Sequence, residues 1–134
     1  MHLGNYFGAI SKWVESQSSP SNIYMIADYH SITNRVSNNP AISQHLIRTL
    51  TYDTTAMLLA CGINPSKSIL FRQSDNPDHT ELQWLLSGIT PLSWLNRMTQ
   101  FKTKKMDKSS VVSAGLYIYP ILMAADILLY KYAI

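Results

Sequence analysis

The chain has 134 residues, of which 46% are hydrophobic and 14% are charged, and its formal net charge at pH 7 is +3. This composition excludes a disordered or fibrous chain and predicts one globular domain. The net charge permits contact with nucleotides or RNA but does not establish it. Cys61 is the only cysteine, so an intrachain disulfide and a zinc site built from cysteines are excluded. It lies in the apolar run of residues 57–61, where we expect a buried structural thiol.

Two stretches bear on where the protein resides. Residues 2–5 lack the charged start of a secretory signal, so we expect a reducing, intracellular setting. Residues 111–130 are almost uncharged, but Pro120 interrupts them and Asp126 lies among them. Because a carboxylate inside a membrane is costly, we predict a buried helix of a globular core here and no membrane span.

The first quarter of the chain predicts a helix, a loop and a strand. Apolar side chains recur at helical spacing over residues 4–15, and a loop rich in Ser and Pro follows over residues 16–22. Residues 23–28 form a short apolar run that ends in Asp28, which is typical of a buried strand in a parallel sheet.

The middle of the chain predicts a long helix and a second strand. Asn39 is placed to cap the helix, Pro40 suits its first position, and Gly62 suits a left-handed cap at its end. The second strand is expected over residues 68–71. Asp78 is expected to cap the next helix, with Glu81 completing a capping box. The remaining predicted elements are a helix over residues 92–101, a basic loop over 102–110, and a helix over 119–130 with Pro120 near its start.

Strands that alternate with helices predict an α/β fold with a parallel sheet and right-handed crossovers. We expect a partial Rossmann-like domain that occupies residues 1–134, without an internal repeat or a second domain. In such a fold a strand should precede the helix that begins at residue 4, and none does. We therefore expect the chain to be incomplete at both ends.

The start of the first helix is a candidate anion site. Free backbone N–H groups and the helix dipole there favour phosphate, and Gly4 leaves room for a base or ribose against the backbone. His2 and Asn5 are candidate donors to phosphate oxygens in a transition state. The alternative is an ordinary helix start.

Tyr119, Met123, Asp126 and Ile127 are spaced to share one helical face. A carboxylate on an apolar face needs a partner, because an unpaired buried charge is costly. An indole N–H is one suitable partner, with Met123 and Ile127 packed on the rings. The alternative is that Asp126 acts as a cap or pairs with an arginine in the core, and the spacing alone does not decide between the two interpretations.

Five stretches together resemble one family. Residues 115–130 resemble the tryptophan-site helix of bacterial and mitochondrial tryptophan–tRNA ligases, and residues 2–6 resemble that family's version of the class I HIGH signature. Residues 28–33, 61–65 and 97–102 resemble the family as well, in the family's order. The resemblance covers nearly the whole chain.

The resemblance implies a role for each matching residue. Asp126 would accept a hydrogen bond from the indole N–H of L-tryptophan, and Tyr119, Met123 and Ile127 would shape its pocket. His30 follows the strand that ends at Asp28, a usual place for ligand contacts, or else it fixes its loop by a hydrogen bond.

The resemblance also implies ATP, with Mg²⁺ on its phosphates. His2, Gly4 and Asn5 would lie at ATP, and Lys104 matches a family position near the phosphates. His2, Asn5 and Lys104 would be the catalytic residues, with no metal held by the protein itself. Other partners implied are tRNA(Trp) and a second copy of the chain, in the cytoplasm or the mitochondrial matrix.

Several family segments have no match in this chain. They are the first strand, the loop after the Asp126 helix, the mobile KMSKS loop and the anticodon-binding domain. Residues 105–109 resemble KMSKS but precede the tryptophan helix, so we expect a solvated lysine run there. We expect the 134-residue chain alone not to charge tRNA. Alternatives are a tyrosine-specific relative and a non-catalytic fragment that acts as a binding module.

Other residues are given structural interpretations. We expect His45 and His79 on the surface of helices. We expect Trp13, Trp84 and Trp94 in the core or at an interface.

Overall fold

The computed structural model describes residues 2–17, 22–33, 40–99 and 113–131. The chain opens with a continuous helical stretch made of α1 (Leu3–Asn5), the π-helical turn η1 (Tyr6–Ile10) and α2 (Ser11–Ser16). This confirms the helix predicted over residues 4–15. The π-turn was not predicted.

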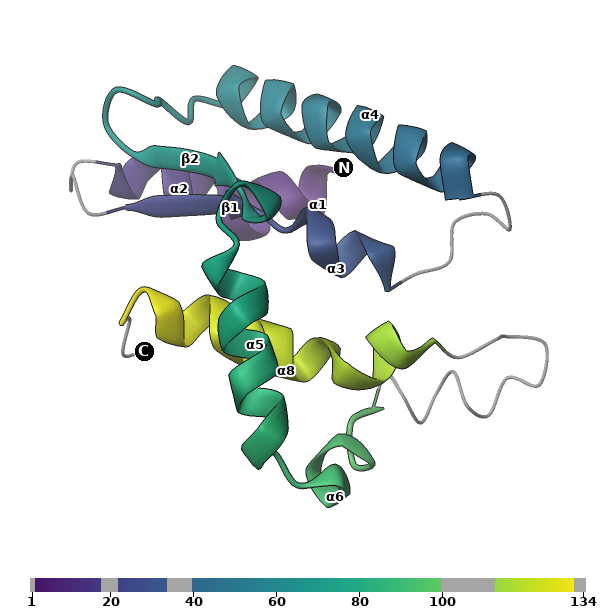
Figure 1. Ribbon diagram of the computed structural model, residues 1–134. Helices are drawn as coiled ribbons and strands as arrows, with labels where there is room; N and C mark the ends of the chain where they lie inside the picture. The colour runs from purple at the N-terminus through teal and green to yellow at the C-terminus, as the bar shows by residue number, and fades with distance from the viewer. Residues whose placement is uncertain (1, 18–21, 34–39, 100–112, 132–134) are drawn as a thin grey trace.

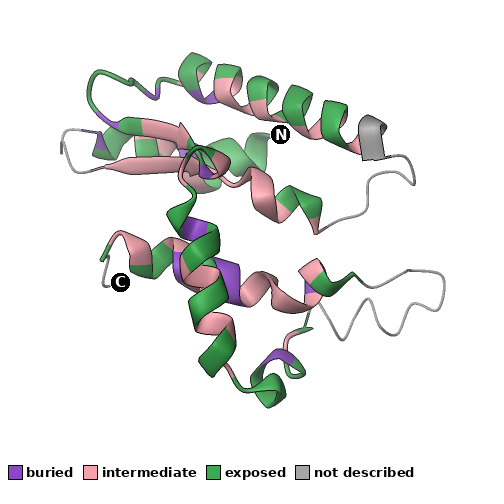
Figure 2. Ribbon diagram, in the orientation of Figure 1, coloured by how far each residue is buried: buried purple, intermediate pink, exposed green. Residues whose placement is uncertain are grey.

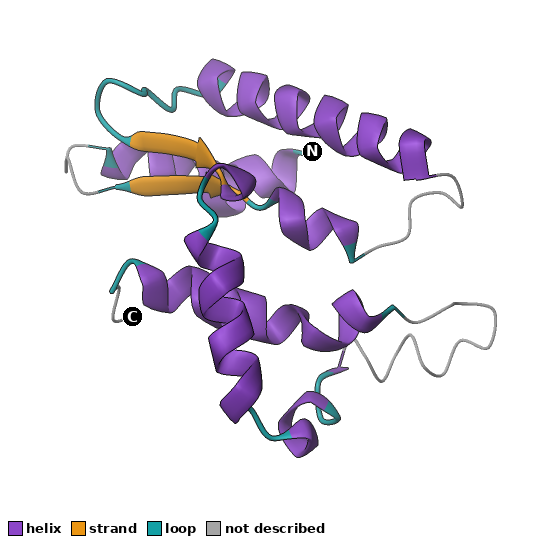
Figure 3. Cartoon of the chain, in the orientation of Figure 1, coloured by secondary structure: helices purple, strands orange, loops and turns teal. Residues whose placement is uncertain are grey.

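Two parallel strands form the sheet of the described residues, as predicted (Figure 3). They are β1 (Ile23–Ile26) and β2 (Ile69–Arg72), and Tyr24 pairs with Leu70 while Met25 pairs with Phe71. Because side chains alternate along a strand, Tyr24 and Leu70 share one face of the sheet and Met25 and Phe71 share the other.

The connection between the strands is helical. The short α3 (Asp28–Ile32), which was not predicted, follows β1, and α4 (Pro40–Ala60) then runs above the sheet in Figure 1. Pro40 begins α4 as predicted, whereas its expected cap Asn39 lies outside the described residues. Gly62 ends the stretch with φ +111°, which confirms the predicted left-handed cap.

The hydrophobic core on one face of the sheet lies between the first helix and α4. Ile10, Leu58 and Ile63 are its buried centre. Tyr24, Ile26 and Leu70 of the sheet pack against it, together with Val14 and Cys61. The first helix and α4 therefore cover the same face of the sheet.

Two crossing helices and the 3-10 turn η2 (Gln73–Asp75) belong to the other side of the molecule. The helix α5 (Asp78–Ile89) crosses α8 (Ala114–Leu129), and both carry buried residues at the crossing (Figures 1 and 2). The ring of Phe71 stacks on His79 at 6.1 Å and meets Tyr130 edge-on at 5.9 Å, centroid to centroid. This aromatic group joins the second face of the sheet to the crossed helices.

The structure corrects three predicted boundaries. The cap of α5 is not Asp78, which is its first helical residue; the N–H of Asp78 donates to Oδ1 of Asn76, and no capping box with Glu81 forms. The helix α6 (Leu92–Leu95) is shorter than predicted.

The last helix, α8, begins well before residue 119, and Pro120 lies inside it. Ser113 supplies its cap, since its Oγ accepts a hydrogen bond from the N–H of Leu116 at 3.1 Å. Pro120 removes one hydrogen bond of the helix and crowds the preceding turn. The burial of Leu116, Ile121 and Leu122 and the cap at Ser113 offset this cost.

Gly62→Ala tests the left-handed cap. A Cβ at position 62 would lie 3.1 Å from Cγ1 of Val14, and its φ disfavours any L side chain. We expect the free energy of unfolding to fall by about 1–2 kcal/mol. The matched control is Gly88→Ala in α5, where a Cβ meets no atom within 4 Å. It should raise stability by about 0.5–1 kcal/mol. Chemical denaturation measures both, and equal effects of the two substitutions would contradict the assignment.

Candidate functional site

The start of the first helix is open to solvent. His2, Gly4 and Asn5 are all exposed, and the backbone N–H of His2 donates to Oδ1 of Asn5 at 3.0 Å. This bond leaves the amide Nδ2 of Asn5 as the group that can donate outward. A Cβ on Gly4 would lie 3.0 Å from the imidazole of His2, so glycine is what allows that ring to lie over the helix start.

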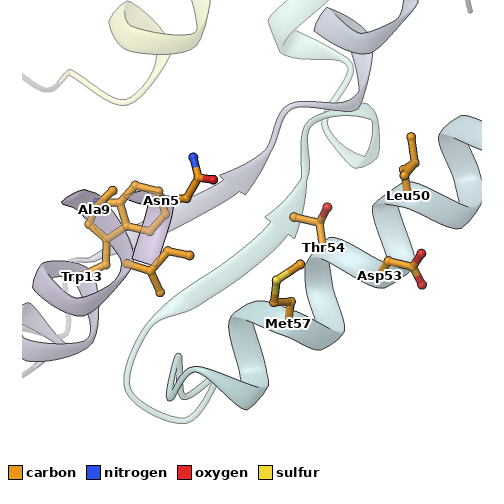
Figure 4. Close-up of a pocket in the computed structure, with 8 residues that line it drawn as sticks. Asn5, Ala9, Trp13, Leu50, Asp53, Thr54 and Met57 are labelled. Atoms are coloured by element: carbon orange, nitrogen blue, oxygen red, sulfur yellow. The ribbon is translucent and has the colours of Figure 1, made fainter. Parts of the chain in front are cut away.

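A hollow of about 500 Å³ adjoins Asn5 between the first helix and α4 (Figure 4). Asn5 and Trp13 line it from one side, and Asp53, Thr54 and Met57 line it from α4. A second, more open hollow is lined by His2, Leu3, Gly4, Tyr6, Met57 and Cys61. The predicted nucleotide residues therefore border open space, which a bound molecule would need.

The carboxylate of Asp126 is the centre of a hydrogen-bond network. Its Oδ1 accepts from Nδ1 of His79 at 2.7 Å and from Nε2 of Gln73 at 2.8 Å, and its Oδ2 accepts from Nε2 of His30 at 2.8 Å. Only 11% of its side chain is exposed. The sequence left three interpretations open for Asp126, namely an indole N–H as its partner, a capping role or an arginine in the core. The partners that the structure describes are two histidines and a glutamine.

Burial and hydrogen bonding act on Asp126 in opposite directions. Burial raises the pKa of its carboxyl, but the hydrogen bonds from His30, Gln73 and His79 lower it by more, so the pKa lies below its ordinary value. At neutral pH the group is an anion that can only accept hydrogen bonds. Each nitrogen that faces it must therefore carry a proton.

Gln73, which the sequence analysis did not select, ties this network to the backbone. Its side chain is fully buried, and its Oε1 accepts from the N–H of Tyr29 at 3.1 Å while its Nε2 donates to Asp126. Next to it, the carboxylate of Asp28 accepts from the N–H and the Oγ of Ser74. These bonds hold α3 and η2 together at the carboxyl ends of the two strands.

The prediction that His79 is a surface residue is wrong. The side chain is 0% exposed, and its Nε2 lies 2.8 Å from the hydroxyl of Tyr130. The residues next to His79 in the sequence do not indicate its burial, because that burial depends on α5 crossing α8. His45, in contrast, is exposed as predicted.

The other residues expected at the tryptophan site lie around Asp126 on α8. The ring of Tyr119 meets the ring of His30 edge-on at 6.4 Å. Met123 is 47% exposed and Ile127 is 39% exposed, so this wall is open to solvent. Of the four residues predicted to share a helical face, Asp126 and Tyr119 both contact His30.

Lys104 and the lysine run at residues 105–109 lie outside the described residues. Among the residues described, no group of three His, Cys, Asp or Glu side chains is arranged to hold a metal ion. Within the same part of the chain, no helix has the length and apolar character needed to cross a membrane.

The structure also corrects the predicted burial of Cys61 and of the tryptophans. Cys61 is only partly buried, beside the start of the first helix. Trp13, Trp84 and Trp94 are 41%, 79% and 58% exposed, so they do not lie in the hydrophobic core. The expectation of an interface stays a prediction.

The two strands are parallel, and helices pack on both faces of the sheet. A polar network lies at the carboxyl ends of the strands. These features define a Rossmann-like α/β domain. The family model of the class I tRNA synthetases (W and Y) matches residues 1–134. The chain belongs to this family.

Relatives and solved structures of the family are similar along nearly the whole chain. A tryptophan–tRNA ligase from a Nostoc species is 50% identical over 131 residues, which are 98% of this chain and 37% of that protein. The structure of the Campylobacter jejuni tryptophanyl-tRNA synthetase complexed with ADP and tryptophan matches with a TM-score of 0.81 at 39% identity, over 95% of this chain and 38% of that one. The Mycoplasma pneumoniae synthetase matches with a TM-score of 0.81 at 40% identity, over 97% and 36%. The chain thus spans little more than a third of its relatives' length.

The lowered pKa of Asp126 predicts how stability depends on pH. A carboxyl with a lowered folded pKa stabilises the fold above its unfolded pKa of about 3.9, and this contribution is lost as the pH falls from there through the folded pKa. We expect Asp126→Asn to be less stable than wild type at pH 7, by a gap that narrows below about pH 4. Urea unfolding across this range measures the gap. The exposed Asp53→Asn is the control, and a gap for Asp126→Asn that stays constant with pH would contradict the network.

Proposed function

We propose that this chain is the nucleotide-binding part of an enzyme that activates L-tryptophan with ATP and ligates it to tRNA(Trp). The observation that carries the proposal is the Asp126 carboxylate, which is nearly buried and ionised beside the open wall of α8. Membership of the class I family (W and Y) and the tryptophan–tRNA ligases among the relatives support it. We expect the enzyme in the cytoplasm or the mitochondrial matrix.

Asp126 is proposed to accept the indole N–H. Met123, one turn before Asp126, and Ile127, the next residue of the helix, are exposed apolar side chains that would pack against the ring system. Tyr119 and His30 would close the pocket from the side, since their rings already contact each other. An apolar wall with one fixed acceptor suits indole, which has a single polar N–H and a large ring area.

ATP is proposed to bind at the start of the first helix. The free N–H groups there, with the side chains of His2 and Asn5, would face the phosphates, and Gly4 would leave room for the base or ribose. Lys104 is assigned to the phosphates from the resemblance alone. Mg²⁺ would arrive on the phosphate oxygens, because the described residues around this helix start offer no cluster of carboxylates to hold it.

The proposed chemistry needs no covalent enzyme intermediate. The carboxylate of tryptophan attacks the α-phosphorus of ATP in line, a new acyl–phosphate bond forms, and the bond to pyrophosphate breaks. The aminoacyl group is then passed to tRNA. The residues of the chain would contribute by holding the two substrates in line and by donating hydrogen bonds to the phosphate oxygens.

A tyrosine-specific enzyme is the second candidate, because the matching family covers both specificities. Met123 and Ile127 favour indole over a phenol, since neither offers a hydroxyl a strong hydrogen-bond partner. A binding module without catalytic activity is the third. The exposed aromatic surface described below would be its binding face.

Asp126→Ala tests the proposal in a complete enzyme, made by replacing the matching 131 residues of the Nostoc relative with this chain. Losing one charged hydrogen bond should lower tryptophan activation by about 30- to 1,000-fold, with the KM for ATP nearly unchanged. Tryptophan-dependent pyrophosphate exchange measures both. Asp78→Ala, on the exposed start of α5, is the control. Equal loss of ATP and tryptophan use would contradict the proposal; a lower melting temperature alone would not, because the substitution also removes three internal hydrogen bonds.

We also propose that the enzyme is a homodimer. Large apolar side chains of α5 and α6 face solvent, including Trp84 at 79% and Ile89 at 78% exposed. Trp94, which is 58% exposed, and Leu128 of α8 line an apolar hollow of about 370 Å³ together with Ile89. Exposed apolar surface of this kind marks an interaction site, and most assemblies of one chain are symmetric dimers.

Ile89→Lys should shift the chimeric enzyme toward the monomer, because a charge would have to be buried in the interface. Light scattering after size-exclusion chromatography measures the mass. Leu50→Lys, at a half-exposed position on α4, should leave the mass unchanged. A monomeric wild type, or equal effects of both substitutions, would rule out this face.

A further inference from the structure

The acceptor positions of Asp126 are unequally used. A carboxylate offers about four acceptor positions, two on each oxygen. Oδ1 accepts two hydrogen bonds, from His79 and Gln73, and Oδ2 accepts one, from His30. Within the described residues these three are its donors, so one acceptor position remains, on Oδ2.

The two oxygens also differ in their surroundings. The donors to Oδ1 are the most deeply buried polar side chains described, since both His79 and Gln73 are 0% exposed. The donor to Oδ2, His30, has a quarter of its side chain exposed. The remaining acceptor position therefore lies on the oxygen whose only partner is solvent-accessible.

A chain of hydrogen bonds fixes the ring of His79. Its Nδ1 faces an anion and must carry a proton, so in the neutral ring Nε2 is an acceptor for the hydroxyl of Tyr130. That hydroxyl in turn accepts from Nδ2 of Asn76 at 3.4 Å. Phe71 stacks on the imidazole at 6.1 Å and limits its rotation.

We propose that His79 is a positioning residue for Asp126: it holds Oδ1 so that Oδ2, beside His30, presents one acceptor position to a ligand with a single N–H donor. This inference rests on the proposed function, because the ligand in question is the indole of tryptophan. His79 itself does not touch the ligand.

The arrangement discriminates by the chemistry of the donor. Indole N–H only donates and matches one acceptor position. A ring that has sulfur in place of N–H leaves that position without a partner, and an unpaired buried acceptor is costly. If the carboxylate turned freely, water or His30 would occupy the position and the discrimination would fall.

Two substitutions of His79 separate positioning from packing. His79→Asn keeps an amide N–H near the place of Nδ1, so it can still donate to Oδ1. His79→Gln places its amide near Nε2, toward Tyr130, and loses that donor. Both are neutral and polar, so burial costs are similar. Tyr130→Phe keeps the aromatic packing and removes only the hydroxyl that fixes the imidazole.

The experiment uses the chimeric enzyme described above and has two parts. Long-range nitrogen–proton NMR reports which ring nitrogens of His30 and His79 carry protons. Calorimetric titration measures the binding of tryptophan and of its benzothiophene analogue, in which sulfur replaces N–H. Melting curves are recorded for each variant.

We expect the proton of His79 on Nδ1 and that of His30 on Nε2 in the wild type. The His30 signal should persist in His79→Asn and change in His79→Gln. The dissociation constant for tryptophan should rise about tenfold in His79→Gln, while that for the analogue stays unchanged and His79→Asn retains the preference. Tyr130→Phe should weaken the preference in the same direction while folding remains intact.

The outcomes that overturn the inference are distinct from those that overturn the proposed function. A His79 proton on Nε2 alone, or equal tryptophan preference in the Asn and Gln variants, would remove His79 from the role. Equal loss of tryptophan and analogue binding, together with a lower melting temperature, would make it structural. A wild type without any preference for tryptophan over the analogue would contradict the proposed function itself.

Discussion

A buried carboxylate needs hydrogen-bond donors, because an unpaired buried charge is costly. The donors to Asp126 determine how the elements at the centre of this molecule pack together. The donors come from three separate elements, since His30 belongs to α3, Gln73 to η2 and His79 to α5. Asp126 itself lies on α8, so one anion ties the carboxyl ends of the strands to the crossed helices. The aromatic group around Phe71 packs on His79, one of the two donors to Oδ1. Replacing any one donor leaves the remaining charge less well compensated.

The same network links stability to binding. The hydrogen bonds that lower the pKa of Asp126 keep it ionised, and an ionised carboxylate is a stronger acceptor for a ligand N–H than a neutral group. Truncation to alanine at this site therefore changes both the fold and the ligand contact. Substitutions that retain one donor and move another, as at His79, separate the two effects.

The local features of this fold could be predicted from the sequence. The apolar run before Asp28, the helix start at Pro40, the left-handed cap at Gly62 and the shared face of Tyr119 and Asp126 all follow from short-range rules. The burial of His79 and Gln73 does not, because it arises where α5 crosses α8 and no local pattern records that crossing. The cap at Ser113 was overlooked because a proline inside α8 suggested a helix start. The nucleotide residues remain predictions, since exposed side chains at a helix start carry little geometric information of their own.

The measurement that tests this account most directly is a crystal structure of the chimeric enzyme with bound tryptophan. The account predicts the indole nitrogen within hydrogen-bond distance of Oδ2 of Asp126, at about 2.7–3.2 Å, with the ring against Met123 and Ile127 and the bonds from His79 and Gln73 to Oδ1 retained. An indole bound elsewhere, or one that reaches the carboxylate only after displacing His79 from Oδ1, would contradict it.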